Sequence, residues 1–394
     1  MLTNTATRYG AISRLLHWII ALLVLTALAL GGLGKLIPRT ANTVEFLQLL
    51  YSTHKTIGVT VLALAILRVV WAFTRPRPVP LHPERKAETY AAEVAHWLLY
   101  AAIFVLPLSG WVMHSAEIGY APIWWPFAQN LPFIPKSETL AATAASVHLV
   151  AAIVMATTVA AHIGGALKHS FIDRDGTLAR MVRGTQAGDP KLVHTTATTV
   201  VVVALTIWST AIGAGVAISM IPGDNAAPTL APVTETAGWA VQDGTVSITI
   251  TQLGAPVTGS FGAWQATIDY DPATGAGEVT AMIDTTSLTL GSVSDQAKGP
   301  EFFDVANFAR AEFVGTIMQT EGPSHTATGT LTLVGQGVPV VLEFDLDLSD
   351  TTATMSGTTT LDRRDFGMGV AYGDESSVGF TVEVSIELTA TQVQ

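Results

Sequence analysis

The chain contains no cysteine, although it is 394 residues long. Without thiols it cannot form disulfides or hold an iron–sulfur cluster, and it cannot attach haem covalently through a CxxCH motif. It is also poor in charge, because Asp, Glu, Lys and Arg make up only 13% of the residues. Low charge together with 49% hydrophobic residues directs attention to apolar stretches that could cross a membrane.

Basic residues are almost missing from the second half of the chain. Of the 20 Lys and Arg residues, four follow Ile221, namely Lys298, Arg310, Arg363 and Arg364, while most of the 31 acidic residues lie there. The net charge of −11 therefore describes an acidic soluble part attached to a mildly basic membrane part. It argues against nucleic acid as a partner, which would need a basic face.

Five apolar blocks in the first half are long enough to cross a bilayer. They cover about residues 15–36, 54–73, 94–115, 144–167 and 192–221. The first block lacks a convincing cleavage site and is predicted to be a retained helix. Lys and Arg are concentrated in the N-terminal segment and in the second and fourth connections, so the positive-inside rule places the N-terminus in the cytoplasm. Five crossings then place the acidic half outside, which in a bacterium is the periplasm.

The second half follows a Pro- and Ala-rich linker at residues 222–234 and alternates apolar with polar residues. Segments 246–251, 278–284, 328–333, 339–348 and 379–388 show the period of two that is typical of half-buried strands. Turn sequences such as Asp271-Pro272 and Gly322-Pro323 separate the segments, and one helical interruption is expected near residues 294–307. The pattern predicts an antiparallel barrel or sandwich.

Two histidines, His148 and His162, lie fourteen residues apart in the fourth apolar block. This spacing is about 21 Å along a helix and leaves both side chains near one face. One histidine then lies near each edge of an apolar core about 30 Å thick. Ionisable or metal-binding side chains inside a span are costly and usually functional. In a bundle without cysteine, two such levels predict two haem groups with imidazole axial ligands.

A haem held by two imidazoles needs two histidines at one depth on facing helices. The predicted topology pairs His54 with His148 at the outer level, and His162 with either His17 or His96 at the inner level. We favour His17, because the first and second helices then each place one histidine opposite the fourth. His96 remains an alternative ligand or a residue of a quinone site.

Other polar residues of the membrane part have weaker assignments. Arg14 and Arg68 are candidates to contact haem propionates or to anchor the helices at the interface. Lys55, beside His54, is a candidate to attract an anion. His114 and His169 are expected to be solvated or to contact propionates, and His82, His194 and His325 show no functional pattern. Four glycines serve either close helix packing or space for a porphyrin: Gly58, Gly110, Gly164 and Gly165.

Several motifs in the first half resemble the bacterial cytochrome b561 family. They are residues 8–18 ending in His17-Trp18, His54 followed by Gly58 and Leu67-Arg68, the segment 106–110, the His148 and His162 pair, and the segment FIDRDGTLARM at 171–181. The resemblance covers about residues 7–183. It implies a four-helix bundle that binds two b-type haems and exchanges electrons with membrane quinone. Some members are superoxide oxidases, which take electrons from superoxide at the outer face and reduce ubiquinone.

Motifs in the second half resemble the YceI-like family. They lie at residues 239–243, 257–264, 268–272, 302–308, 311–313, 329–335 and 362–367. This resemblance implies a lipocalin-like antiparallel barrel that holds a long isoprenoid, including ubiquinone-type tails. A barrel of about eight strands can enclose one ligand. Candidates for the apolar lining are Phe261, Trp264, Phe302, Phe303, Phe308, Phe313 and Phe366.

The sequence therefore predicts a multidomain membrane protein. Residues 1–185 form an all-α transmembrane four-helix haem bundle, 186–221 a fifth transmembrane helix, 222–234 a linker and 235–394 a periplasmic all-β barrel. The predicted function is that of an inner-membrane oxidoreductase that transfers electrons between an outer-face one-electron donor, such as superoxide, and ubiquinone from the quinone pool of the membrane. The barrel binds quinone or another isoprenoid. The alternatives are a membrane-anchored isoprenoid-binding or transport protein and a cytochrome subunit for a partner dehydrogenase. Electron direction and the choice between monomer and homodimer stay open.

Overall fold

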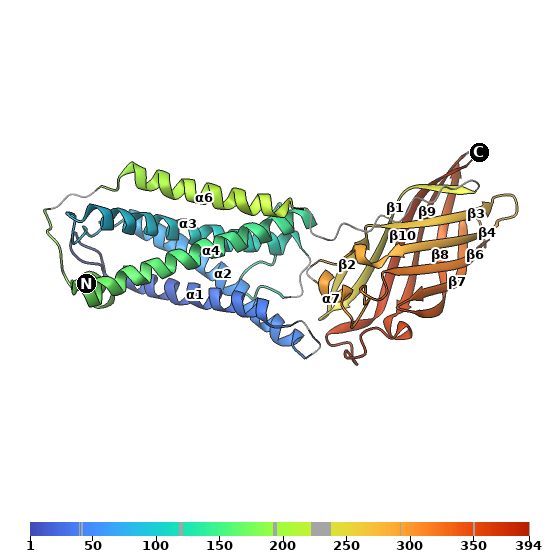
Figure 1. Cartoon of the computed structure of the whole chain (residues 1–394), viewed down its shortest axis with the longest axis horizontal. Helices are drawn as coiled ribbons and strands as arrows, with labels where there is room; N and C mark the ends of the chain where they lie inside the picture. The colour runs from blue at the N-terminus through green and yellow to red at the C-terminus, as the bar shows by residue number, and fades with distance from the viewer. Residues whose placement is uncertain are drawn as a thin grey trace. The chain divides into compact units, whose positions relative to one another are not determined.

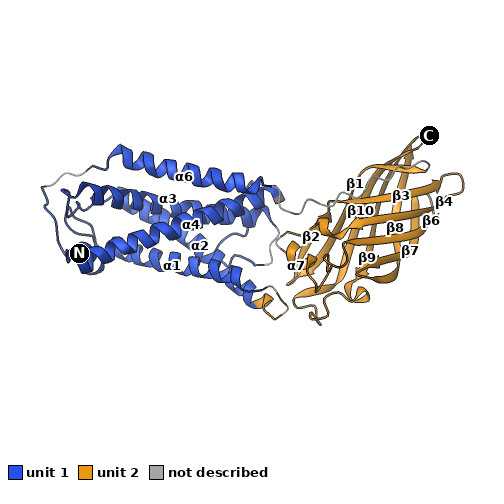
Figure 2. Cartoon of the chain, in the orientation of Figure 1, with its two compact units in different colours: residues 1–38, 46–117, 121–221 blue, residues 39–45, 118–120, 222–394 orange. Residues whose placement is uncertain are grey.

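The chain forms two compact units, which Figure 2 shows in different colours. The structure is a computed structural model and describes residues 1–38, 40, 42–117, 121–191, 195–221, 238–291, 293–349 and 351–393. The long helices belong to the first unit and the strands to the second. The predicted linker at 222–234 lies outside the described residues, as do residues 192–194 of the predicted fifth span, including His194.

Five long helices make up most of the first unit (Figure 1): α1 (Ala11–Leu36), α2 (Val44–Phe73), α3 (Lys86–Ala116), α4 (Glu138–Lys168) and α6 (Thr198–Ser219). Each is long and apolar enough to cross a membrane, so the prediction of five spanning helices is confirmed within the described residues. Four of them, α1 to α4, begin before the predicted apolar blocks. Hydropathy marks the part of a helix suited to lipid, whereas the hydrogen-bonded turns continue into polar flanks such as residues 86–93.

The chain turns sharply after α4. A π-helical turn, η1 (His169–Asp173), extends α4, and Arg174 then takes a left-handed conformation with φ 53° before the short helix α5 (Thr177–Val182). Arg180 of α5 donates a hydrogen bond from Nη1 to the carbonyl oxygen of Val79, at 2.9 Å. The connection before α3 and the connection after α4 therefore meet at one end of the bundle. We name it the His162 end, and the opposite end the His148 end.

Helix α6 packs along α3 and α4. Gly215 makes the approach to α4 close, since a Cβ there would lie 2.7 Å from the Cα atom of Val147. Trp208 is buried and donates from Nε1 to the carbonyl oxygen of Leu98 in α3, at 3.3 Å. These contacts, together with core side chains from all five helices, make α6 an integral part of the bundle.

The second unit is a closed antiparallel barrel. Its strands are β1 (Trp239–Gln252), β2 (Ala255–Phe261), β3 (Trp264–Asp271), β4 (Ala276–Asp284), β5 (Leu288–Thr289), β6 (Arg310–Gln319), β7 (Ser324–Leu333), β8 (Gln336–Ser349), β9 (Thr352–Asp362) and β10 (Val378–Gln392). β1 pairs with β10 on one side and with β3 on the other, which closes a ring of β1, β3, β4 and β6 to β10. β2 pairs with the second part of β1, and β5 pairs with β2. The closure confirms the predicted barrel and excludes the sandwich.

Short helical segments interrupt the barrel. They are η2 (Thr285–Ser287), α7 (Ser294–Lys298) and η3 (Arg363–Phe366). α7 falls where a helical interruption was expected, but it is shorter than the predicted segment at 294–307. Residues 299–307 instead form successive turns, and Asp304 among them has a positive φ of 42°. A left-handed residue cannot continue an α-helix.

Candidate haem and ligand sites

At the His148 end, the structure brings together the two histidines predicted for the outer level. The ring centroids of His54, from α2, and His148, from α4, lie 6.1 Å apart. An imidazole nitrogen lies about 2 Å from a metal ion that it binds and roughly 1 Å from its own ring centroid, so two imidazoles on opposite sides of one iron have centroids about 6 Å apart. The separation therefore fits an iron held between the two rings.

Both rings of this pair have a defined orientation. His54 donates from Nδ1 to the carbonyl oxygen of Ala27 at 2.9 Å. His148 donates from Nδ1 to the carbonyl oxygen of Leu106 at 3.0 Å and also lies 3.1 Å from the hydroxyl of Ser109. A carbonyl oxygen only accepts, so Nδ1 carries the proton and Nε2 keeps the free electron pair. Metal-binding histidines are commonly oriented in this way by a bond from the second ring nitrogen.

A glycine makes room for each ring. Gly31 and Gly110 each lie one helical turn after the carbonyl acceptor that holds the histidine. A Cβ at Gly31 would lie 3.0 Å from Cε1 of His54, and one at Gly110 would lie 3.1 Å from Cε1 of His148. Gly110 was considered in the sequence, but Gly31 was missed, because nothing in the first block identifies its acceptor carbonyl. A Cβ at the other three glycines considered would meet no atom within 4 Å: Gly58, Gly164 and Gly165.

At the His162 end, three histidines lie together. The ring centroids of His17 and His162 are 6.3 Å apart, whereas those of His96 and His162 are 5.1 Å apart. The first separation fits an iron between the rings, by the same estimate of about 6 Å. The second is too short for that arrangement. The geometry therefore favours His17 as the partner of His162 and leaves His96 beside the pair.

The two candidate propionate contacts differ in their surroundings. Arg14 donates from Nη1 to the carbonyl oxygen of Val182 at 2.9 Å, and its buried Nε has no hydrogen-bond partner in the described structure. Arg68 lies with Cζ 5.7 Å from the ring centroid of Tyr100 and borders a large cavity. Both arginines are at the His162 end.

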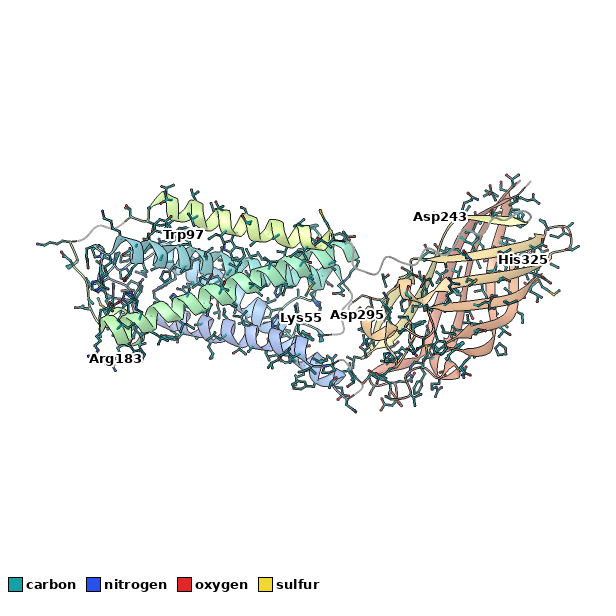
Figure 3. The ribbon with its side chains drawn as sticks, in the orientation of Figure 1. Lys55, Trp97, Arg183, Asp243, Asp295 and His325 are labelled. Atoms are coloured by element: carbon teal, nitrogen blue, oxygen red, sulfur yellow. The ribbon has the colours of Figure 1, made fainter. Side chains whose placement is uncertain are left out.

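Lys55 lies inside the bundle rather than on an open surface. Its ammonium donates to the carbonyl oxygen of Ala121 at 2.7 Å and lies 3.1 Å from Nδ1 of His114. Figure 3 labels Lys55 near one end of the bundle and Arg183 at the other. His114 is only 8% exposed, so the expectation that it is solvated is wrong. The prediction failed because His114 lies at the very end of the apolar block in sequence, but the connection after α3 folds back over it.

A large cavity of about 1000 Å³ lies at the His162 end of the bundle. Helices α2, α3 and α6 and the connection before α3 line it, with His96, Arg68 and Trp208 among the lining side chains. Arg180 also lines it. This side chain is 5% exposed, and its Nε and Nη2 have no hydrogen-bond partner in the described structure. The cavity thus combines apolar and aromatic walls with buried N–H donors free to bind an oxygen atom of a ligand.

The barrel encloses a second cavity, of about 260 Å³, with walls that are almost entirely apolar. Six of the seven predicted lining residues border it: Phe261, Trp264, Phe302, Phe303, Phe313 and Phe366. Phe308 does not. Its side chain is 36% exposed and packs against Gly335 on the outside, because residues 299–307 form turns that leave Phe308 beyond the barrel wall.

Polar groups mark the two ends of this barrel cavity. At one end, the buried guanidinium of Arg363 makes five hydrogen bonds to backbone carbonyls, those of Met368, Gly369, Tyr372, Val378 and Gly379. Burial there raises the pKa of Tyr372 to about 12. At the other end, the hydroxyl of Tyr270 lies 2.7 Å from Nε2 of His325, which is 3% exposed. Figure 3 labels Asp295, of α7, and His325 at opposite ends of the barrel. The sequence missed His325, since a lone histidine in a strand shows no pattern.

Comparison with known proteins agrees with the division of the chain into a helical unit and a barrel. Residues 8–184 match the family model for prokaryotic cytochrome b561, and residues 239–390 match the model for the YceI-like domain. Helix α6 lies outside both matches. The chain is 30% identical to cytochrome b561 homolog 2 of Escherichia coli (strain K12), over 46% of this chain and 94% of that protein.

Two further relatives extend the comparison. The probable superoxide oxidase CybB of Yersinia pestis is 25% identical, over 44% of this chain and 96% of that protein. The crystal structure of Burkholderia cenocepacia BcnA is similar to the second unit, with a TM-score of 0.36 and 30% identity over 38% of this chain and 96% of that one. The chain is thus a multi-pass membrane protein of the prokaryotic cytochrome b561 family that also carries a YceI-like domain.

Proposed function

We propose that the chain is a membrane electron-transfer protein that binds two haem b groups and connects a one-electron donor at one face with quinone at the other. The observation that carries this proposal is the presence of two interhelical histidine pairs at opposite ends of the bundle, with centroid separations of 6.1 and 6.3 Å. Membership of the cytochrome b561 family implies haem b. Four side chains would hold the iron atoms: His17, His54, His148 and His162.

Neighbouring groups of the chain orient these histidines and place positive charge beside them. Haem supplies one-electron chemistry when it is bound. The bonds from Nδ1 to the carbonyls of Ala27 and Leu106 hold the imidazoles of His54 and His148 in place and raise their basicity. Arg14 and Arg68 supply positive charge at the His162 end, where propionates can be paired. The wide separation of the two ends along α4 provides two redox positions across the membrane.

We further propose that the His162 end faces the cytoplasm and the barrel faces the periplasm of a bacterial inner membrane. The positive-inside rule supports this orientation. The N-terminal segment and the connections at the His162 end carry most of the cations of the membrane part, among them Arg8, Arg75, Arg77, Arg85, Lys86, Arg174, Arg183 and Lys191. An odd number of spanning helices supports placing the two ends of the membrane part on opposite sides.

The cavity of about 1000 Å³ at the His162 end is the proposed quinone site. A quinone ring needs apolar walls and donors for its carbonyl oxygens, and such pockets usually combine the two. Trp97 and Trp208 supply apolar walls, and the unpartnered Nε and Nη2 of Arg180 supply donors. His96 lines this cavity, which supports its assignment to the quinone site rather than to iron.

At the His148 end, the proposed donor is superoxide. The ammonium of Lys55 contributes a positive charge close to His54, and an anion approaching this end would be attracted by it. The relative named as a probable superoxide oxidase supports this choice. In the second unit, the apolar cavity of the barrel is proposed to hold the isoprenoid tail of quinone or a related lipid.

The test uses the full chain purified in detergent. We expect a b-type spectrum when reduced and oxidised forms are compared, with two haems per chain. Superoxide is expected to reduce these haems, and added ubiquinone to reoxidise them. Protein that binds haem but reacts with neither superoxide nor quinol would contradict the electron-transfer function, and protein without a b-type spectrum would contradict the haem assignment.

Substitution of Gly31 with alanine tests how the ring of His54 is held. The added methyl group would lie 3.0 Å from Cε1 of His54, so the ring must shift and its bond to Ala27 weakens. Changes in such supporting groups cost about 10- to 100-fold in metal affinity, and we expect loss of this size for one haem. Gly32→Ala is the matched control, because a Cβ there meets nothing within 4 Å. Equal haem retention in the two variants would contradict the assignment.

A further inference from the structure

A cluster of titratable side chains at the His162 end has no role in holding haem. It joins His82, in the connection before α3, with His169 of η1 and Asp175, which precedes α5. The two imidazoles are parallel, with an interplanar angle of 2° and centroids 6.5 Å apart. No joint function was predicted for these residues, because they come from two different connections.

The carboxylate of Asp175 bridges the two rings. Its Oδ2 accepts from Nδ1 of His169 at 2.7 Å and from Nε2 of His82 at 3.1 Å, while its Oδ1 accepts from the backbone N–H of Thr177 at 2.8 Å. Burial raises the pKa of Asp175, but the hydrogen bonds from Thr177 and His169 outweigh burial and leave it below its usual value. The bridge therefore consists of one ionised carboxylate between two imidazoles.

The other ring nitrogen of His82 leads away from the bridge. Nδ1 of His82 lies 3.1 Å from Oε1 of Glu84, whose side chain is 66% exposed. His169 lines the large cavity, as His82 does. A continuous series of hydrogen-bonding groups thus runs from an exposed carboxylate, through His82 and Asp175, to His169 at the cavity wall.

The neighbouring charges form a network that meets the bridge at His169. Lys168 pairs with Glu88 at 3.0 Å and with Asp173 at 2.9 Å, and Arg85 pairs with Asp173 at 3.2 Å and with Glu88 at 3.5 Å. Asp173 also lies 3.1 Å from Nδ1 of His169. Glu88, His169 and Asp173 are close enough to hold a metal ion, but Lys168 and Arg85 already occupy the two carboxylates. In the described structure, Asp175 has no Lys or Arg among its ion-pair partners.

We propose that His82, Asp175 and His169 form a proton relay between the aqueous face and the cavity at the His162 end. This inference rests on the proposed reduction of quinone in that cavity. Histidine is the side chain best suited to take up and release protons near neutral pH, and a π-helical turn such as η1 often occurs at a functional site.

The relay supplies what the reaction requires. Conversion of a quinone to a quinol adds two electrons and two protons, one proton to each carbonyl oxygen. The electrons come one at a time from the donor at the His148 end, through the bundle. The protons come from water. A proton that enters at Glu84 passes to Nδ1 of His82, and Nε2 of His82 gives its proton to Oδ2 of Asp175. Oδ2 gives this proton to Nδ1 of His169, in the tautomer that leaves this nitrogen free, and His169 releases one from its other ring nitrogen toward the cavity.

The test compares Asp175→Asn with Asp189→Asn in the full chain loaded with haem. Asparagine at 175 keeps an oxygen for the N–H of Thr177 but replaces the bridging oxygen with a donor. Asp189 is exposed and accepts from the backbone N–H of Lys191 in a similar turn, so its variant controls for lost charge. Haem reduction by superoxide without quinone is measured first, and then steady-state reduction of ubiquinone as a function of pH and in D₂O.

Positioned acid–base groups contribute roughly 10²-fold or more, and we expect ubiquinone reduction by Asp175→Asn to fall at least about tenfold. The fall should steepen as pH rises, with a larger D₂O effect, while haem reduction stays unchanged. Turnover and pH profile equal to those of wild type would overturn the relay and leave the proposed function standing. Haem reduction without ubiquinone reduction in the wild type would overturn both. If Asp175→Asn loses its haems, His82→Gln takes its place, since that side chain is 32% exposed.

Discussion

Replacement of His148 with alanine is expected to leave one haem b per chain instead of two, and replacement of His162 to remove the other. Each histidine belongs to a different pair. The ring centroid of His148 lies 6.1 Å from that of His54, and the ring centroid of His162 lies 6.3 Å from that of His17. A single imidazole cannot hold the iron in six-coordinate form. The measurement is haem content per chain by pyridine haemochrome, together with the spectrum of the haem that remains.

The residual spectra should differ between these two variants, because the two sites differ in their surroundings. The Nδ1 atoms of His54 and His148 donate to backbone carbonyls, whereas the ring nitrogens of His17 and His162 have no such partner in the described structure. Imidazoles whose second nitrogen donates a hydrogen bond are more basic ligands. Identical potentials and spectra in both variants would contradict separate sites.

His96 provides the control for this experiment. Its ring centroid lies 5.1 Å from that of His162, which is too close for an iron between the rings. His96→Ala is therefore expected to keep both haems. His17→Ala is expected to lose the same haem as His162→Ala. The reverse result, with loss in His96→Ala and retention in His17→Ala, would exchange the two assignments and move the proposed quinone site.

Filling the barrel cavity is expected to remove its ligand. Ala327 is 2% exposed, lines the cavity from β7 and lies opposite Ile317 and Leu342 on the neighbouring strands. A phenyl ring in Ala327→Phe would occupy space proposed for an isoprenoid tail. Overpacking costs about 1–3 kcal/mol, and about 1.4 kcal/mol is a tenfold change. Isoprenoid affinity should therefore fall roughly 10- to 100-fold, as measured by titration and by mass spectrometry of co-purified lipid.

The matched control is Thr328→Phe, the next residue on the same strand, whose side chain points outward and is exposed. It adds the same ring without entering the cavity. Both variants need thermal unfolding curves, so that lost binding is separated from lost folding. If Ala327→Phe is folded and retains lipid at the level of Thr328→Phe, the ligand does not occupy this cavity.

The sequence was a good guide wherever one residue class repeats with a fixed period. Hydropathy located all five long helices, and alternation located five strands of the barrel, β1, β4, β7, β8 and β10. Depth in the predicted helices placed His54 with His148, because position along a helix follows directly from residue number. Six of seven aromatic residues predicted for the barrel lining border the cavity. Three of them, Phe261, Trp264 and Phe313, lie on strands, where alternate positions share a face.

Contacts that depend on the rotation of one helix against another could not be read from the sequence. The carbonyl of Ala27, the space at Gly31 and the contact between Lys55 and His114 all depend on which face meets which neighbour. The same holds for Asp175, whose two imidazole partners come from connections on either side of α3 and α4. A period identifies the buried face of an element, but it does not identify the element that covers it.

The closure of the barrel has a consequence for how the second unit folds. Trp239 at the start of β1 pairs with Gln392 near the end of β10, so the contact that completes the ring joins residues far apart in the chain. Such nonlocal pairings have a high contact order and form slowly. Until β10 has been made, β1 and β9 present open edges and the apolar lining faces water. During that interval the unit is exposed to edge-to-edge pairing with other chains, and its folding is limited by delivery of the last strand.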